Sequence, residues 1–247
     1  MKPSHPPLRN NPLISIRNLT VGFDQTPVFE QLNLTFYQGD RVALIGANGS
    51  GKTTLLKTIL GLVEKSSGTV DIEKNVRIGY LPQVLQIADR QFPMSVREVI
   101  QQGLLSKSPF PRFIKNEDRI QMDIAIKKAG IEPLLDQRYG YLSMGQKQLV
   151  LFVRMLLQKP DIVFLDEPTS SLDVSRKDSI YQMLAELTTN HVAYVIITHD
   201  LPSFNETIDR VILLEHSILF DGNHREFCEN KAFSPFIHAH GHTHEHL

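Results

Sequence analysis

The segment GANGSGKTT, residues 46–54, has the residue types and spacing of a loop that binds phosphates. Its glycines allow backbone N–H groups to turn toward an anion, at the positive end of the helix expected from about residue 52 to 60. Lys52 can reach the β- and γ-phosphates of a nucleotide, and the Thr53 hydroxyl can ligate Mg²⁺. The apolar run RVALIG before the loop disfavours the alternative of a glycine-rich turn with a chance lysine. The sequence therefore predicts nucleotide binding.

A second candidate for chemistry is IVFLDEP, residues 162–168, in which four apolar residues lead into two carboxylates. A buried strand of this kind delivers Asp166 to the carboxyl edge of a parallel sheet, where open α/β folds bind nucleotides. Asp166 suits the ligand shell of Mg²⁺, and Glu167 suits a base that polarises an attacking water. The same letters could end any strand before a turn, but after a phosphate-binding loop the functional interpretation is favoured.

The elements that must position these residues alternate between strands and helices. Residues 13–46 are strand-like, and further strands are expected at GTVDI, VRIGYL, DIVFLDEP, VAYVIITHD and RVILLEHSILF. A helix is expected from about Ser175 to Leu187. This alternation indicates a parallel-sheet nucleotide domain.

The stretch from about residue 88 to 158 is helical in character instead. Ser95 and Glu98 form a capping box at the start of one helix. Another helix ends at Gly130 and is expected to place Ile120 and Ile124 on the face opposite its last lysines. A helical subdomain is therefore expected inside the nucleotide domain.

Composition narrows the class of protein. The chain has 247 residues, of which 41% are hydrophobic, and its 26 basic and 27 acidic residues leave a net charge of −1, which gives no footprint for nucleic acid. The single cysteine, Cys228, fits a reducing compartment. No apolar stretch is long enough to span a membrane, and residues 1–12 are expected to form a disordered lead.

Four more motifs identify a resemblance. LSMGQKQ at 142–148, Gln83 in GYLPQ, SSLD at 170–173 and His199 in ITHD follow in the order found in ATPase subunits of ABC transporters, which the chain resembles from about Leu13 to Gly222. The resemblance implies an α/β P-loop NTPase with a RecA-like core, an N-terminal antiparallel β subdomain and the inserted helical subdomain. It makes 13–222 the ATPase domain and 223–247 a C-terminal extension.

The resemblance also implies roles for single residues. Phe23 would stack on adenine, Ser143 and Gly145 would touch the γ-phosphate held by a second copy, and Asp173 would lie at the interface of the two copies. The catalytic set would be Glu167, His199 and Gln83, and the ligands of Mg²⁺ would be Thr53, Gln83 and Asp166. The residues expected to contact ATP are Phe23, Gly46, Asn48, Gly49, Ser50, Gly51, Lys52, Thr53, Thr54, Ser143, Gly145, Gln146, Asp166 and Asp173.

Two positions depart from the family pattern. Met144 replaces the first glycine of the family's Leu-Ser-Gly-Gly-Gln motif, and its side chain is harmless only if its φ is negative. Leu149 stands where an arginine is usual. We expect re-tuned activity, with a weakly hydrolysing, ATP-gated clamp as the alternative.

Part of the chain resembles a subset of the family, the ATPases of zinc and manganese importers. The pattern is VRIGYLPQ followed by FPMSVREVI. It implies ATP-powered import of a divalent metal, with zinc favoured and manganese, iron or another solute as the alternative. The implied partners are a second copy, membrane permease subunits and, indirectly, a metal-binding receptor, at the cytoplasmic face of the inner membrane. A GTPase is disfavoured because Asn230-Lys231 is not followed by the rest of a guanine-binding motif.

The chain ends in HAHGHTHEHL, with a histidine at every second position: His238, His240, His242, His244 and His246. Imidazole is a suitable ligand for Zn²⁺, and an extended chain with this period sets all five rings on one side. The sequence predicts a weak, regulatory zinc site, and the alternatives are a solvated tail or a purification tag.

Overall fold

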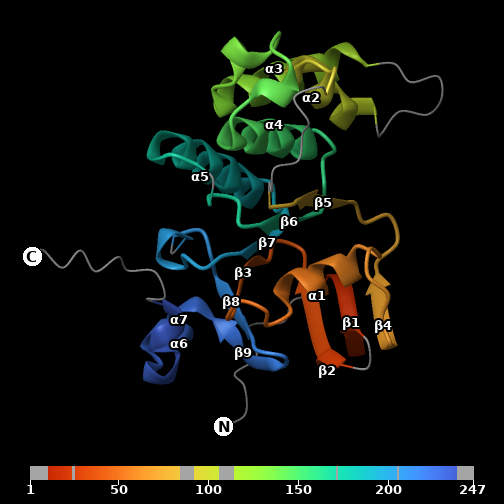
Figure 1. The fold of residues 1–247 in the computed structure, drawn as a ribbon, viewed down its shortest axis with the longest axis vertical. Coiled ribbons are helices and arrows are strands. Elements are labelled where there is room, and N and C mark those ends of the chain that lie inside the picture. The colour runs from red at the N-terminus through yellow and green to blue at the C-terminus, as the bar shows by residue number, and fades with distance from the viewer. Residues whose placement is uncertain are drawn as a thin grey trace, which may run out of the picture. The chain divides into compact units, whose positions relative to one another are not determined.

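The computed structural model describes residues 11–23, 26–83, 92–105, 114–170, 172–204 and 206–237. These residues form two compact units (Figure 1). Unit 1 combines residues up to Val76 with those from Ala193 onward, and unit 2 runs from Arg77 to Val192. Unit 1 therefore pairs a strand near the start of the chain, residues 41–45, with two strands near its end, residues 193–197 and 210–214.

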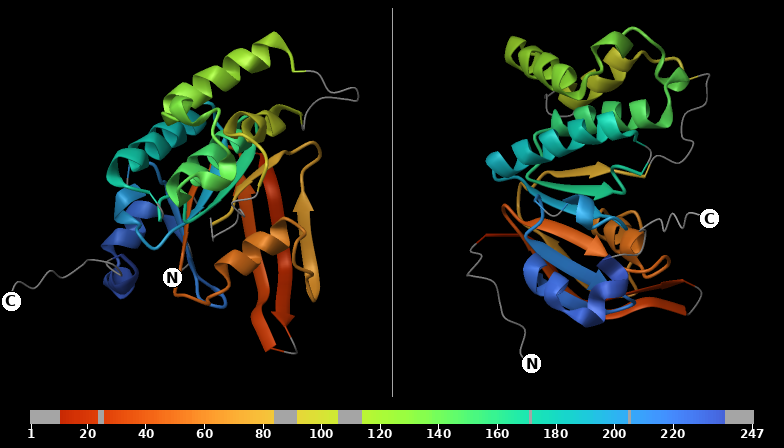
Figure 2. Two further views of the ribbon diagram at one scale, coloured as in Figure 1. Left: turned by 45° about the horizontal axis from the view of Figure 1, so that its top comes forward. Right: turned by 90° about the vertical axis from the view of Figure 1, so that its left-hand side faces the viewer.

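Unit 1 contains two groups of strands. Its elements are β1 (Pro12–Phe23), β2 (Thr26–Tyr37), β3 (Arg41–Ile45), α1 (Lys52–Ile59), β4 (Ser67–Ile72), β7 (Ala193–Ile197), β8 (Arg210–Leu214), β9 (Ile218–Asn223), α6 (His224–Glu229) and α7 (Ser234–Ile237). An antiparallel sheet has the order β2-β1-β4, and its three strands lie side by side in the left view of Figure 2. A second group has β3 between β7 and β8, both parallel to it, with β9 antiparallel at the edge.

The burial of these strands explains their pairing. In β3, β7 and β8 nearly every residue is buried, as expected for parallel strands covered on both faces. In β1 and β2 buried and exposed positions alternate over much of the length, so one face of that sheet packs inward. The expected strand RVILLEHSILF is wrong as a single element. It divides into β8 and β9, because His216 adopts a left-handed backbone conformation in the turn between them.

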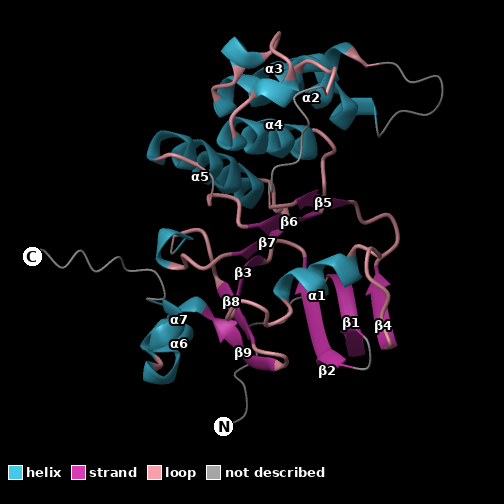
Figure 3. Cartoon of the chain, viewed as in Figure 1, coloured by secondary structure: helices cyan, strands magenta, loops and turns pink. Residues whose placement is uncertain are grey.

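Unit 2 is mainly helical (Figure 3). Its elements are β5 (Ile78–Leu81), α2 (Val96–Leu105), α3 (Asn116–Ala129), α4 (Met144–Leu156), β6 (Ile162–Asp166) and α5 (Val174–Thr189). Single 3₁₀ turns lie at Glu132–Leu134 and Tyr139–Tyr141, and in unit 1 at Pro202–Phe204 and Lys231–Phe233. β5 and β6 pair in parallel.

The expected capping box at the start of α2 is confirmed. The backbone N–H of Ser95 donates to Glu98 Oε2 at 2.7 Å, and the N–H of Glu98 donates to Ser95 Oγ at 3.3 Å. Gly103 lets α2 approach α4 closely, because a Cβ there would lie 2.2 Å from the carbonyl oxygen of Arg154.

The expected apolar face of α3 is wrong. Ile120 and Ile124 are exposed, at 58% and 42%. The helix instead buries Met122, Ile126 and Ala129, which recur at the helical spacing of three to four residues. Apolar residues occupy more than one face of this helix, so periodicity alone could not identify the buried one.

Candidate functional site

The phosphate-binding loop in unit 1 has the backbone that its glycines were expected to provide. Gly46, Gly49 and Gly51 all have positive φ, at 151°, 84° and 101°. A Cβ on Gly46 would lie 2.1 Å from the carbonyl oxygen of Leu214, so that position has no room for a side chain. The loop leads directly into α1, whose N-terminus carries the uncompensated N–H groups and positive dipole end that favour an anion.

Lys52 is buried in this loop, with only 6% of its surface exposed. Its ammonium group donates to the carbonyl oxygens of Gly46 and Ala47, at 2.9 and 2.7 Å. These two carbonyl oxygens hold the ammonium group at the first turn of the loop. It therefore offers a positioned cation for a phosphate.

Strand register places His199 at the same edge as the loop. Leu44 of β3 pairs with Ile197 of β7, and the chain continues two residues beyond each of them to Gly46 and His199. Neighbouring strands lie about 4.8 Å apart. The structure therefore brings the proposed γ-phosphate histidine to the edge of the sheet where the loop begins.

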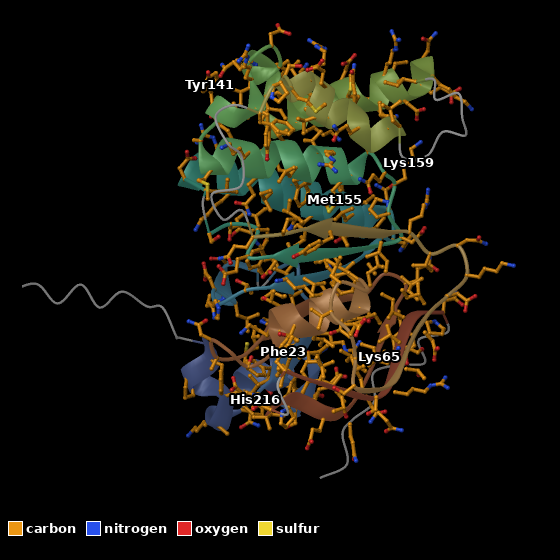
Figure 4. All side chains as sticks on the ribbon, turned by 45° about the vertical axis from the view of Figure 1, so that its right-hand side comes forward. Phe23, Lys65, Tyr141, Met155, Lys159 and His216 are labelled. Atoms are coloured by element: carbon orange, nitrogen blue, oxygen red, sulfur yellow. The ribbon has the colours of Figure 1, made fainter. Side chains whose placement is uncertain are left out.

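The pairing of β3 with β8 reveals a further residue at the loop, Glu215, which the sequence alone did not identify. Ile45 of β3 pairs with Leu213 of β8, and two residues further along the carboxylate of Glu215 accepts a hydrogen bond from the N–H of Ala47. The next residue, His216 (labelled in Figure 4), donates its backbone N–H to the Ser50 carbonyl oxygen at 3.3 Å. The turn between β8 and β9 thus holds both ends of the loop's first turn.

In unit 2 the two expected carboxylates, Asp166 and Glu167, lie at the end of β6, which pairs with β5. Leu81 pairs with Leu165, and two residues beyond each member of this pair Gln83 Nε2 donates to Glu167 Oε2 at 2.7 Å. Asp166 is the last residue of β6 and is 5% exposed. Burial, together with the charge of Asp166, raises the pKa of Tyr80 to about 12, so the phenol stays protonated.

The signature segment, Leu142–Gln148, forms the start of α4. Ser143 caps the helix: the N–H of Gln146 donates to Ser143 Oγ at 3.3 Å, and the N–H of Ser143 donates to Gln146 Oε1 at 2.9 Å. Met144 is the first helical residue, and its φ is not among the positive ones, so the condition set for its side chain is met. Leu149 is buried in unit 2, at 1% exposure.

Two further residues were expected in the site, Phe23 and Asp173. Phe23, at the end of β1, is 54% exposed, as a stacking ring must be (Figure 4). Asp173 caps α5 by accepting a hydrogen bond from the N–H of Arg176 at 3.0 Å. Within the described residues no cluster of three or more histidine, cysteine, aspartate or glutamate side chains could hold a metal. The five tail histidines lie outside those residues.

Comparison with known proteins identifies the family. Residues 29–170, more than half of the chain, match the ABC transporter family. The chain belongs to the ABC transporter family. Among the described residues, no helix is both long and apolar enough to cross a membrane.

Individual relatives agree with this assignment. The zinc uptake system ATP-binding protein ZurA of Listeria innocua is 34% identical over 226 residues, 88% of each chain. The zinc import ATP-binding protein ZnuC of Marinobacter nauticus is 35% identical and covers 90% of this chain and 82% of its own. A solved ABC transporter in an inward-facing conformation is similar with a TM-score of 0.76 at 26% identity, over 92% of this chain and 88% of the other.

Proposed function

We propose that this chain is the ATP-hydrolysing subunit of an ABC importer for a divalent metal ion, and that the ion is zinc. Membership of the ABC transporter family supports ATP-driven transport, and relatives with about a third of their residues identical are named for zinc import. The hydrogen bond between Gln83 and Glu167 is the observation that carries the catalytic part, because it fixes a carboxylate beyond a buried strand.

The phosphate loop and His199 would bind the nucleotide phosphates. The N–H groups of residues 48–54 and the Lys52 ammonium supply positive charge to the β- and γ-phosphates. His199 would donate a hydrogen bond to the γ-phosphate, and the exposed ring of Phe23 would stack on adenine.

Glu167 would act as the base that polarises the attacking water. Gln83 Nε2 donates to Oε2 of Glu167 at 2.7 Å, which holds the carboxylate in one orientation. The amide of Gln83 therefore orients the base.

Thr53, Gln83 and Asp166 fit Mg²⁺, because each presents an oxygen, the donor type that this ion prefers. Asp166 is buried, and it is the one carboxylate of this set. When bound, the ion would neutralise part of the phosphate charge.

A second copy of the chain would complete each ATP site through Ser143, Gly145 and Gln146 of its signature segment, with Asp173 at the interface. The position of Met144 in the first turn of α4 supports this, because a helical residue there takes a side chain without backbone strain. The remaining partners in this proposal are membrane permease subunits, which would hold the chain at the cytoplasmic face of the inner membrane, and a metal-binding receptor.

Phosphate release from Mg-ATP tests the enzymatic part. Glu167→Gln should bind ATP, form a stable dimer and scarcely hydrolyse, and Lys52→Ala should weaken binding itself. Full turnover by Glu167→Gln would remove the proposed base. Met144→Gly should keep equal or higher activity, and a severe loss would give Met144 a role of its own.

Reconstitution with the permease tests the transported ion. ATP-dependent accumulation of zinc, with manganese and iron as matched competitors, should favour zinc. Equal accumulation of manganese would contradict the choice of ion and leave the ATPase proposal intact.

The histidine tail is proposed to bind Zn²⁺ and lower transport once zinc is sufficient. Ordering a chain costs about 1–2 kcal/mol per residue, so the site should be weaker than a preformed one. Calorimetry should show extra zinc binding in the full chain relative to a version ending at Ile237. Equal binding would exclude the site, and equal sensitivity of transport to zinc would exclude the regulation.

A further inference from the structure

Gln148 is a polar side chain in a place where an apolar one would pack without difficulty. It lies in α4 with 0% of its surface exposed, among the buried residues Leu149, Val150 and Phe152. Its Nε2 donates to the main-chain oxygen of Glu167 at 3.2 Å. Its Oε1 is also buried and has no hydrogen-bond partner among the described residues. A buried acceptor without a donor destabilises a fold, so the amide at this position opposes stability.

Glu167, the residue that Gln148 contacts, has an unusual backbone. Its φ is +49°, in the left-handed region that residues other than glycine seldom occupy. Its carbonyl oxygen also accepts hydrogen bonds from Ser170, from the N–H at 3.3 Å and from Oγ at 3.0 Å. A strained conformation persists only where its surroundings determine it, and these donors converge on the same peptide group.

We propose that Gln148 is a positioning residue for Glu167, and that it links the start of α4 to the hydrolytic carboxylate. The inference rests on the function proposed for Glu167. By turning the peptide of Glu167, Gln148 fixes the direction in which the carboxylate leaves the chain toward Gln83.

The link to the signature segment follows from helix geometry. Ser143 caps the helix in which Gln148 lies five residues later, about 7.5 Å along the axis at 1.5 Å per residue. A displacement of the capped first turn, for example when it contacts a nucleotide on a second copy, is carried along the helix to Gln148. The amide then transmits it to the Glu167 peptide.

The test replaces Gln148 with methionine, which has a similar length and no N–H donor. In full-length protein, Gln148→Met should lower kcat for ATP about 10- to 100-fold, as misplacement of a reacting group does. The KM and the affinity for a fluorescent ATP analogue should stay within about twofold, because the nucleotide contacts are untouched. The melting temperature should be equal or higher, since an unpartnered buried oxygen is removed.

Two further variants keep the inference falsifiable. Leu149→Met is the matched control, at a buried neighbour in the same helix, and should leave kcat and the melting temperature nearly unchanged. Ser170→Ala removes another donor to the same carbonyl at an exposed position, so it should fold and lower kcat in the same direction.

The outcomes separate this inference from the proposed function. A wild-type protein without ATP turnover would overturn both. A wild-type protein that hydrolyses ATP, with full kcat in Gln148→Met or in Ser170→Ala, would overturn the positioning role alone. A fall in kcat matched by losses of melting temperature and nucleotide affinity would show that Gln148 only supports the fold.

Discussion

Replacing Glu215 with alanine should weaken ATP binding, because its carboxylate anchors the entrance of the phosphate loop. The carboxylate accepts a hydrogen bond from the N–H of Ala47, the second residue of the loop. His216 adds two bonds from the same turn, to the carbonyl oxygens of Ser50 at 3.3 Å and, from Nδ1, of Val28 at 2.8 Å. Without Glu215 the Ala47 N–H loses its acceptor, and the first turn of the loop is held by its remaining contacts.

The magnitude follows from the kind of bond that is lost. A hydrogen bond to a charged group contributes about 1.5–3 kcal/mol, and each 1.4 kcal/mol is a factor of about ten in affinity. If the whole of this free energy were lost from nucleotide binding, the affinity for ATP would fall roughly 10- to 150-fold. Lys52 still holds the Gly46 and Ala47 carbonyl oxygens in the variant, so we expect the lower end, about tenfold.

Glu215→Gln separates the effect of the hydrogen-bond acceptor from the effect of the negative charge. Glutamine keeps an acceptor oxygen, and a hydrogen bond between neutral groups is about half as strong. It also removes a negative charge next to a loop that binds phosphates, which acts in the opposite direction. The affinity should therefore change by no more than about threefold.

Equilibrium titration with a fluorescent ATP analogue measures both variants, with kcat and melting temperature recorded on the same preparations. Wild-type affinity in Glu215→Ala would refute the anchor. Tighter binding in Glu215→Ala would show that repulsion of the phosphates outweighs it. A glutamine variant as weak as alanine would mean that the charge itself, and not the acceptor, holds the loop.

Three further outcomes follow from the geometry. Gly46→Ala should abolish measurable ATP binding in titrations, because its Cβ would lie 2.1 Å from a carbonyl oxygen. Arg210→Met should lower the free energy of unfolding in urea by about 3–5 kcal/mol, since it removes the ion pair, 2.9 Å long, between Arg210 and the carboxylate of Asp40, whose side chain is 3% exposed; Asp40→Asn in the same background should recover part of the loss. The hydrogen bond from Arg77 lowers the pKa of Asp161, so this pair stabilises the fold above the unfolded pKa of about 3.9 and loses its effect as the pH falls through the lower folded pKa. Thermal midpoints of wild type and Asp161→Asn should therefore differ slightly near neutral pH and converge in acid, and the difference is small because both side chains are partly exposed.

Local patterns were the most predictable part of this protein. The glycine loop and the capping box at Ser95 are short segments whose residue types require one backbone geometry, and the structure has that geometry. The buried parallel strands were also predictable, because a short continuous apolar run, such as VALI in β3 or IVFL in β6, is typical of a strand covered on both faces.

Contacts set by strand register could not be read from the sequence. Ala47 and Glu215 are 168 residues apart and meet only because Ile45 pairs with Leu213. Gln148 lies in the signature segment LSMGQKQ, but nothing in that motif shows that its amide contacts the main-chain oxygen of Glu167. The sequence signal for this contact was a glutamine followed by the apolar run Leu149–Phe152.

The two adjacent carboxylates show why register and backbone strain matter together. Successive residues of a strand point to opposite faces, so Asp166 and Glu167 could not share one side of the sheet if β6 simply continued. The strand ends at Asp166, and the positive φ of Glu167 turns the chain at once. Asp166 stays buried, while the Glu167 carboxylate reaches the amide of Gln83. A left-handed residue costs of order 1–3 kcal/mol, and here the turn brings the Glu167 carboxylate to the amide of Gln83, at the end of the strand that carries Asp166, as the roles proposed for the two acids require.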